Sequence, residues 1–113
     1  MGCLFCEIAE KKRPAKLIYE DDLVIAFEDI NPQAPVHCLI VPKKHISTSL
    51  EIEKEDNELV GHLFQIGNKI AKAKGVAERG FRLVMNCNPE SGQTVFHIHL
   101  HILGGRIMHW PPG

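Results

Sequence analysis

The sequence lacks any apolar run that approaches the roughly 20 residues a membrane-spanning helix needs. Its first residues also lack a basic segment followed by an apolar stretch, which a secretory signal would require. Excess charge of either sign is absent, because 13 lysines and arginines face 14 aspartates and glutamates, for a formal net charge of -1. Binding to nucleic acid or anionic lipid needs a basic surface. We therefore expect a cytoplasmic protein with no affinity for nucleic acid or membranes.

Internal repeats, low-complexity segments and linkers rich in glycine or serine are also missing. The chain has 113 residues, of which 44% are apolar and 24% charged. These proportions are near the average for soluble globular domains. A chain of this length buries roughly two-thirds of its unfolded surface, enough for a core. We predict one domain over residues 1–113.

Short periodic runs separated by proline and glycine predict five strands and two helices. Asp21 and Asp22 separate the first two strands, which indicates a hairpin. A long helix is predicted where apolar residues recur at steps of three and four, and Gly75 follows it in a position that suits a left-handed cap. The predicted strands span 16–20, 23–27, 37–41, 81–86 and 95–103, and the predicted helices 5–11 and 53–74. The fold class is α+β, an antiparallel sheet with the long helix on one face.

Three of the seven histidines alternate with apolar residues within the last predicted strand. Alternate side chains of a strand point to opposite faces. Phe96, Ile98, Leu100 and Ile102 should then pack into the core, and His97, His99 and His101 should form a row on the other face. A solvated polar face is the ordinary explanation for one histidine. Three in strict alternation favour a metal site, a catalytic imidazole, or both.

The run from His97 to Leu103 resembles the signature of the histidine triad (HIT) family, His-φ-His-φ-His-φ-φ, where φ is apolar. Further segments are similar to the Hint branch of that family: 14–16, 20–22, 31–37, 42–47 and the tail 104–113, which includes Trp-Pro-Pro-Gly. The resemblance implies a HIT-like fold whose sheet extends across a homodimer.

The resemblance also implies a reaction. The middle histidine of the family attacks the α-phosphorus of a nucleotide derivative, which makes His99 the expected nucleophile. A nucleotidyl-histidine would form, and water would release the nucleoside monophosphate. His101 would donate to phosphate oxygens or to the leaving group, and His37 would support the triad from a neighbouring strand. The expected substrate is a purine nucleoside phosphoramidate, in which AMP or GMP is joined to an amine.

Further positions of the chain match the family's substrate-binding residues. Asp29 matches the residue that binds the ribose hydroxyls, and Trp110 belongs to a tail that shapes substrate choice across the dimer. Glu28 and the segment 88–90 depart from common family patterns, and Thr94 stands where serine is frequent. The phosphate or leaving group is expected to contact Asn86, Gly92 and Thr94, and the base pocket to be lined by Leu4, Phe5, Ile8, Phe27 and Ile30.

Two cysteines, Cys3 and Cys6, have the two-residue spacing of a zinc knuckle. The alternative is a pair of packed thiols in a small helix. Some bacterial members of the resembled family complete a structural zinc site with two histidines, which match His45 and His97 here. Zinc would then be structural and not required for catalysis. Cys38 and Cys87 have the surroundings of ordinary thiols.

Two other functions compete with the phosphoramidate hydrolase. One is hydrolysis of dinucleoside polyphosphates within the same family. The other is a non-enzymatic zinc-binding adaptor, in which the histidines serve metal and partner contacts. The Trp-Pro-Pro tail at Trp110 favours the first choice, and replacement of His99 separates an enzyme from an adaptor.

Overall fold

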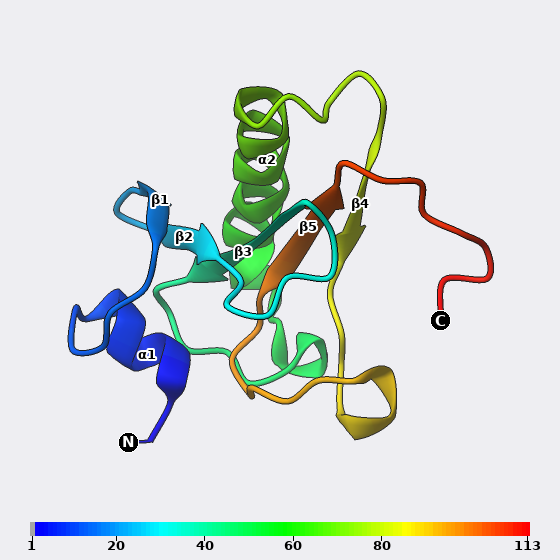
Figure 1. Ribbon diagram of the computed structural model, residues 1–113. Helices are drawn as coiled ribbons and strands as arrows, with labels where there is room; N and C mark the ends of the chain where they lie inside the picture. Colours follow the sequence, from blue (N-terminus) through cyan, green and yellow to red (C-terminus); the bar gives the residue numbers. More distant parts are fainter. Residues whose placement is uncertain (1) are drawn as a thin grey trace.

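The computed structural model describes residues 2–113 and contains one five-stranded antiparallel sheet in the order β1-β2-β3-β5-β4. Met1, the first residue of the predicted domain, lies outside the described residues. The sheet, one long helix and one short N-terminal helix confirm the predicted α+β fold (Figure 1). The elements are α1 (Leu4–Ala9), β1 (Leu17–Glu20), β2 (Val24–Glu28), β3 (Val36–Pro42), α2 (Asn57–Ala73), β4 (Phe81–Val84) and β5 (Leu100–Gly104), with 3-10 turns η1 (Ser49–Glu51), η2 (Lys54–Asp56) and η3 (Pro89–Ser91).

Helix α2 packs against one face of the sheet. Leu63, Ile66 and Ile70 form its buried stripe, in contact with apolar side chains of β2, β3 and β5. Gly67 lets the helix approach closely, because a Cβ there would lie 3.2 Å from Ile40 Cδ1. The predicted start at residue 53 is wrong, since residues 54–56 form the 3-10 turn η2 before the helix. Gly75 has a φ of +77° and closes the helix as predicted.

Helix α1 covers part of the opposite face. Phe5 and Ile8 project from it into a second apolar cluster with Ile25, Phe27 and Leu39. Strand β2 therefore sends alternate side chains to the two helices, and both β2 and β3 are almost wholly buried. The sequence analysis predicted this short helix, but not the face of the sheet that it covers. The packing of α1 on this face places the helix beside the histidines.

The last strand begins later than its alternation predicts. Strand β5 starts at Leu100, and the main-chain N–H of Ile98 donates to the carbonyl of Ile46, which lies in a loop. The carbonyl of Pro42, at the end of β3, accepts a hydrogen bond from the His97 ring at 2.7 Å. The His97 side chain thus occupies a carbonyl of β3 that could otherwise accept a main-chain hydrogen bond from a neighbouring strand. The prediction that Phe96 lies in the core is wrong. Phe96 precedes the segment held by these two hydrogen bonds, and its side chain is 40% exposed.

The hairpin predicted around Asp21 and Asp22 is confirmed, with Glu20 opposite Ile25 in the β1-β2 pair. The Asp21 carboxylate stabilises the turn by accepting from the main-chain N–H groups of Leu23 and Val24.

Across residues 2–113, no helix has the length and apolar character needed to cross a bilayer.

Candidate functional site

The three alternating histidines lie on the sheet face that α1 covers, while Ile98, Leu100 and Ile102 join the core beneath α2. His97 and His99 immediately precede β5, and His101 is its second residue. His97 is fully buried, His99 is 8% exposed and His101 is partly exposed. The predicted opposite orientation of the two sets is confirmed from residue 97 to residue 102.

The ring of His99 is held in one orientation by its own chain. Its Nδ1 lies 2.8 Å from the carbonyl oxygen of His97, and a carbonyl can only accept, so Nδ1 carries the proton. Burial lowers the pKa of His99, which keeps the ring neutral. Its Nε2 has no hydrogen-bond partner among residues 2–113. Every fully buried side-chain nitrogen in that range has a partner, so Nε2 is not fully buried. Nε2 therefore presents a lone pair to solvent, as a nucleophile requires.

His37 and His101 form a hydrogen-bonded pair on the same face. The main-chain N–H of Gln33 donates to His37 Nδ1 at 3.0 Å, so the proton of the neutral ring is on Nε2. His37 Nε2 then donates to His101 Nδ1 at 2.9 Å. This leaves His101 with its proton on Nε2, the nitrogen not engaged by His37. Burial, with further contributions from His99 and His37, lowers the pKa of His101 to about 4.

Asp29 lies beside this pair, with its Oδ2 atom 3.4 Å from His37 Nε2. Its Oδ1 accepts from the main-chain N–H of Asn31, which leaves further acceptor capacity on the carboxylate. The donor atoms of Asp29, His37 and His101 lie within 4.8 Å of one another. A metal ligand nitrogen must be unprotonated, whereas the Gln33 bond leaves the proton of His37 on Nε2. The cluster is therefore arranged as a chain of hydrogen bonds.

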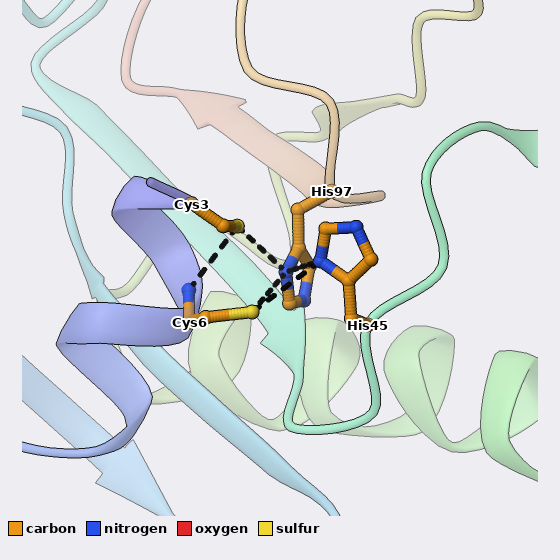
Figure 2. A group of neighbouring side chains, drawn as sticks. All are labelled: Cys3, Cys6, His45 and His97. Carbon is orange, nitrogen blue, oxygen red and sulfur yellow. Dashed lines mark hydrogen bonds between the residues drawn. The ribbon is translucent and has the colours of Figure 1, made fainter. Parts of the chain in front are cut away.

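A separate group of four side chains meets where α1 approaches the histidines. Figure 2 shows Cys3 and Cys6 at the start of α1, facing His97 and, from the loop after β3, His45. The His97 Nδ1 atom lies 3.3 Å from Cys3 Sγ, 3.5 Å from Cys6 Sγ and 3.1 Å from His45 Nδ1. All four donor atoms lie within 4.8 Å of one another. The predicted ligand set is thus gathered in one place.

The chemistry of this group fits a metal ion. His97 Nε2 donates to Pro42, so its Nδ1 carries a lone pair that points at the two sulfurs. Two thiolates and two imidazoles are a common tetrahedral zinc set. Zinc-ligand bonds of about 2.0 to 2.3 Å imply donor separations of roughly 3.3 to 3.8 Å, close to those observed. Burial and the neighbouring Cys3 raise the pKa of the Cys6 thiol to about 11, and a bound cation would reverse this shift.

The base-pocket candidates divide into two groups. Phe5, Ile8 and Phe27 are buried together, and the Phe5 ring meets the His99 ring edge-on at 4.9 Å between centroids. Leu4 is 37% exposed and is not part of this cluster. Ile30 is 99% exposed and contributes no wall to this cluster. The apolar surface at the nucleophile therefore comes mainly from α1.

The remaining candidates lie in loops. Gly92 has a φ of +98°, a conformation that suits glycine, and Thr94 is exposed in the same loop. Asn86 follows β4, and neither it nor Thr94 makes a side-chain hydrogen bond to the three histidines among the described residues. Trp110 is 82% exposed in the tail.

Two glutamines at the site were missed from the sequence. Gln33 orients His37 through its main-chain N–H. Gln93 is buried, and its side chain donates to the carbonyls of Ser47 and Val95, which fixes the loop that holds Gly92 and Thr94. No local pattern marks either residue, because Gln33 acts through its backbone and Gln93 joins its own loop to Ser47, which is distant in sequence.

The chain is similar to known proteins over most of its length. A model of the HIT domain matches residues 10–108. An uncharacterized HIT-like protein of Synechocystis sp. is 50% identical over 110 residues, which are 97% of this chain and 96% of that protein. The crystal structure of a HIT family hydrolase from Legionella pneumophila Philadelphia 1 is 52% identical, with a TM-score of 0.98 over 99% of this chain and 100% of that chain. A Zn-bound histidine triad family protein from Mycobacterium smegmatis is 34% identical, with a TM-score of 0.82 over 94% of this chain and 76% of that one.

The hydrogen bonds predict the proton positions on three rings. Near neutral pH, long-range proton-nitrogen NMR correlations should identify His99 as the Nδ1–H tautomer and His37 and His101 as Nε2–H tautomers. His101 should stay neutral at about pH 5, because burial lowers its pKa from 6.5 to about 4. The unfolded chain binds the extra proton first, so this group reduces the free energy of unfolding as the pH falls from 6.5 towards 4. An Nε2–H signal from His99 would contradict the assignment.

Proposed function

The chain belongs to the HIT domain family, and from that premise we propose that it is a nucleotide-binding hydrolase that cleaves the P–N bond of purine nucleoside 5′-phosphoramidates. The observation that supports this most directly is the His99 ring, whose Nδ1 is held by a carbonyl while its Nε2 has no protein partner. The similarity to a HIT family hydrolase from Legionella pneumophila supports hydrolysis as the reaction class.

In the first proposed step, His99 Nε2 attacks the α-phosphorus. The P–N bond breaks, the amine leaves with a proton from solvent, and a nucleotidyl-histidine forms. The ring becomes positively charged because Nδ1 keeps its proton, and the His97 carbonyl stabilises that charge through the 2.8 Å hydrogen bond. The neutral resting state of His99 favours attack, since a protonated ring has no lone pair to offer.

In the second step, water attacks the same phosphorus. The bond between phosphorus and Nε2 breaks, the nucleoside monophosphate leaves, and the water returns a proton to solvent. His101 is suited to donate its Nε2–H to a phosphate oxygen in both steps, because His37 occupies its other nitrogen. A neutral donor of fixed orientation stabilises developing charge without reorganisation.

The nucleoside is proposed to bind between Asp29 and α1. A carboxylate accepts two hydrogen bonds from vicinal ribose hydroxyls, and Asp29 has acceptor capacity left for them. Phe5 offers an apolar surface next to the nucleophile. Asn86, Gly92 and Thr94 are proposed to contact the phosphate or the leaving group.

Zinc is proposed as a structural ion held by Cys3, Cys6, His45 and His97. The donor set and its spacing support this choice, and the Zn-bound relative from Mycobacterium smegmatis adds to it. The ion would join α1 to the chain segment on which the nucleophile depends. The proposed reaction is performed by His99 and needs no metal.

A homodimer that extends the sheet is also proposed. Strand β4 is at the edge of the sheet, so within residues 2–113 one side of its backbone has no neighbouring strand. Such edges pair readily with a second chain. Light scattering should therefore give the mass of two chains, and a monomeric mass would contradict the proposal.

Replacement of the nucleophile tests the reaction. His99→Ala should lower the rate of adenosine phosphoramidate hydrolysis by about 10³-fold or more, because no other side chain takes over the attack. His99→Gln, closer in size, should lose the same activity, and circular dichroism should show both variants folded. His62→Ala is the matched control, since that imidazole on α2 bonds Asp21 away from the site and its loss should leave the rate nearly unchanged.

The same assay separates the competing functions. Faster wild-type turnover of dinucleoside polyphosphates than of phosphoramidates would favour the polyphosphate hydrolase. Wild-type protein without hydrolytic activity on either substrate, but with bound zinc, would favour the adaptor. Comparable rates for wild type and the folded His99→Ala variant would reject His99 as the nucleophile.

Metal analysis tests the zinc site. Freshly purified protein should contain about one zinc ion per chain, because the four donor atoms make one tetrahedral set. Cys6→Ser should lose most of the zinc, whereas Cys87→Ser, a change at another partly buried cysteine outside the cluster, should keep it. Wild-type protein without metal would rule out the site.

A further inference from the structure

We infer that Arg106 is a positioning residue for the proposed hydrolysis. By holding the loop at Gln33, Arg106 sets the proton position on His37 and, through His37, on His101. The inference rests on the proposed function. It concerns the Gly-Gly-Arg segment at residues 104–106, whose role the catalytic scheme leaves open.

Three consecutive residues of this segment lie along the loop before β3. Gly104 pairs with Val36 at the end of the β3-β5 ladder. Gly105 has a φ of +91°, and a Cβ there would lie 2.9 Å from Pro35 Cβ, so the two segments pack closely. Arg106 Nε then donates to the main-chain carbonyl of Gln33 at 3.0 Å. The segment after β5 thus continues alongside the loop beyond the last ladder pair.

Arg106 is suited to fix that loop. Its guanidinium also donates to the carbonyl of Ile107 at 3.1 Å, and no carboxylate among residues 2–113 lies within salt-bridge distance of it. The planar guanidinium therefore bridges two main-chain carbonyls with donors in a fixed geometry. Its role in the structure is to bind backbone oxygens of the loop and the tail.

The Gln33 residue that Arg106 holds also faces the histidine pair. Its carbonyl accepts from Arg106, and its main-chain N–H donates to His37 Nδ1. Loss of the first bond would free Gln33 to move, and His37 Nδ1 would then be open to protonation. A proton on Nδ1 in the neutral ring leaves Nε2 without one, so His37 could no longer donate to His101. His101 would in turn lose its fixed donor towards the phosphate.

The proposal is tested with Arg106→Ala in the full-length chain. Turnover of an adenosine phosphoramidate should fall about tenfold in kcat, the effect of losing one oriented hydrogen bond, with KM within about twofold. The NMR signals of His37 should change from one Nε2–H tautomer to a mixture, which a general loss of stability would not produce. Arg106→Lys keeps a donor without the fork and should lie between the two.

Arg82→Ala is the matched control. Arg82 donates to the carbonyl of His109 in the same tail and makes no hydrogen bond to Gln33 among residues 2–113, so this variant should keep the wild-type His37 tautomer. The same tautomer change in Arg82→Ala would overturn the inference, as would an unchanged His37 tautomer in Arg106→Ala. If the wild type does not hydrolyse phosphoramidates, the proposed function fails, while the NMR comparison of the two variants still decides the role of Arg106.

Discussion

The hydrogen bond from His99 Nδ1 to the carbonyl of His97 is the interaction on which the site depends. Imidazole has two nitrogens of similar basicity, and a free ring interconverts between tautomers. A carbonyl at 2.8 Å selects one of them and leaves the lone pair at Nε2. Burial acts in the same direction, because it lowers the pKa of His99 and disfavours the protonated ring. Orientation and charge are therefore both set before any ligand binds.

That bond requires the chain to leave the regular sheet. Between residues 97 and 99 the backbone bonds to a loop carbonyl and the His97 ring bonds to the end of β3. The carbonyl of His97 is thereby free to accept from the next histidine instead of from a neighbouring strand. Helix α1 covers the sheet face that carries these histidines. With six residues, the helix is too short to be stable alone. Its position depends on the burial of Phe5 and Ile8 and on Cys3 and Cys6 at its start, which face the other two metal-ligand candidates, His45 and His97.

Much of this architecture is predictable from local sequence pattern. The period of α2, its Gly75 cap, the hairpin at Asp21 and the alternation from His97 to Ile102 all follow from residues close together in the chain. The predictions for Phe96 and for the start of β5 are wrong, because alternation alone does not reveal which backbone segment lies alongside the strand. The role of Gln33 was missed for a similar reason, since an N–H group is identical in every residue but proline and gains meaning only from its neighbour.

His97 combines a side chain that faces the two cysteines with a carbonyl that faces the nucleophile. The two tasks belong to different parts of one residue. Metal binding requires the imidazole itself, whereas the carbonyl requires only the path of the chain, to which the ring contributes through its bond to Pro42. Evolution can therefore exchange the imidazole at this position, and the cysteines with it, while the carbonyl stays in place as long as the chain follows the same path. Descendants of one ancestor could diverge in their need for a metal and still inherit the same reactive nitrogen.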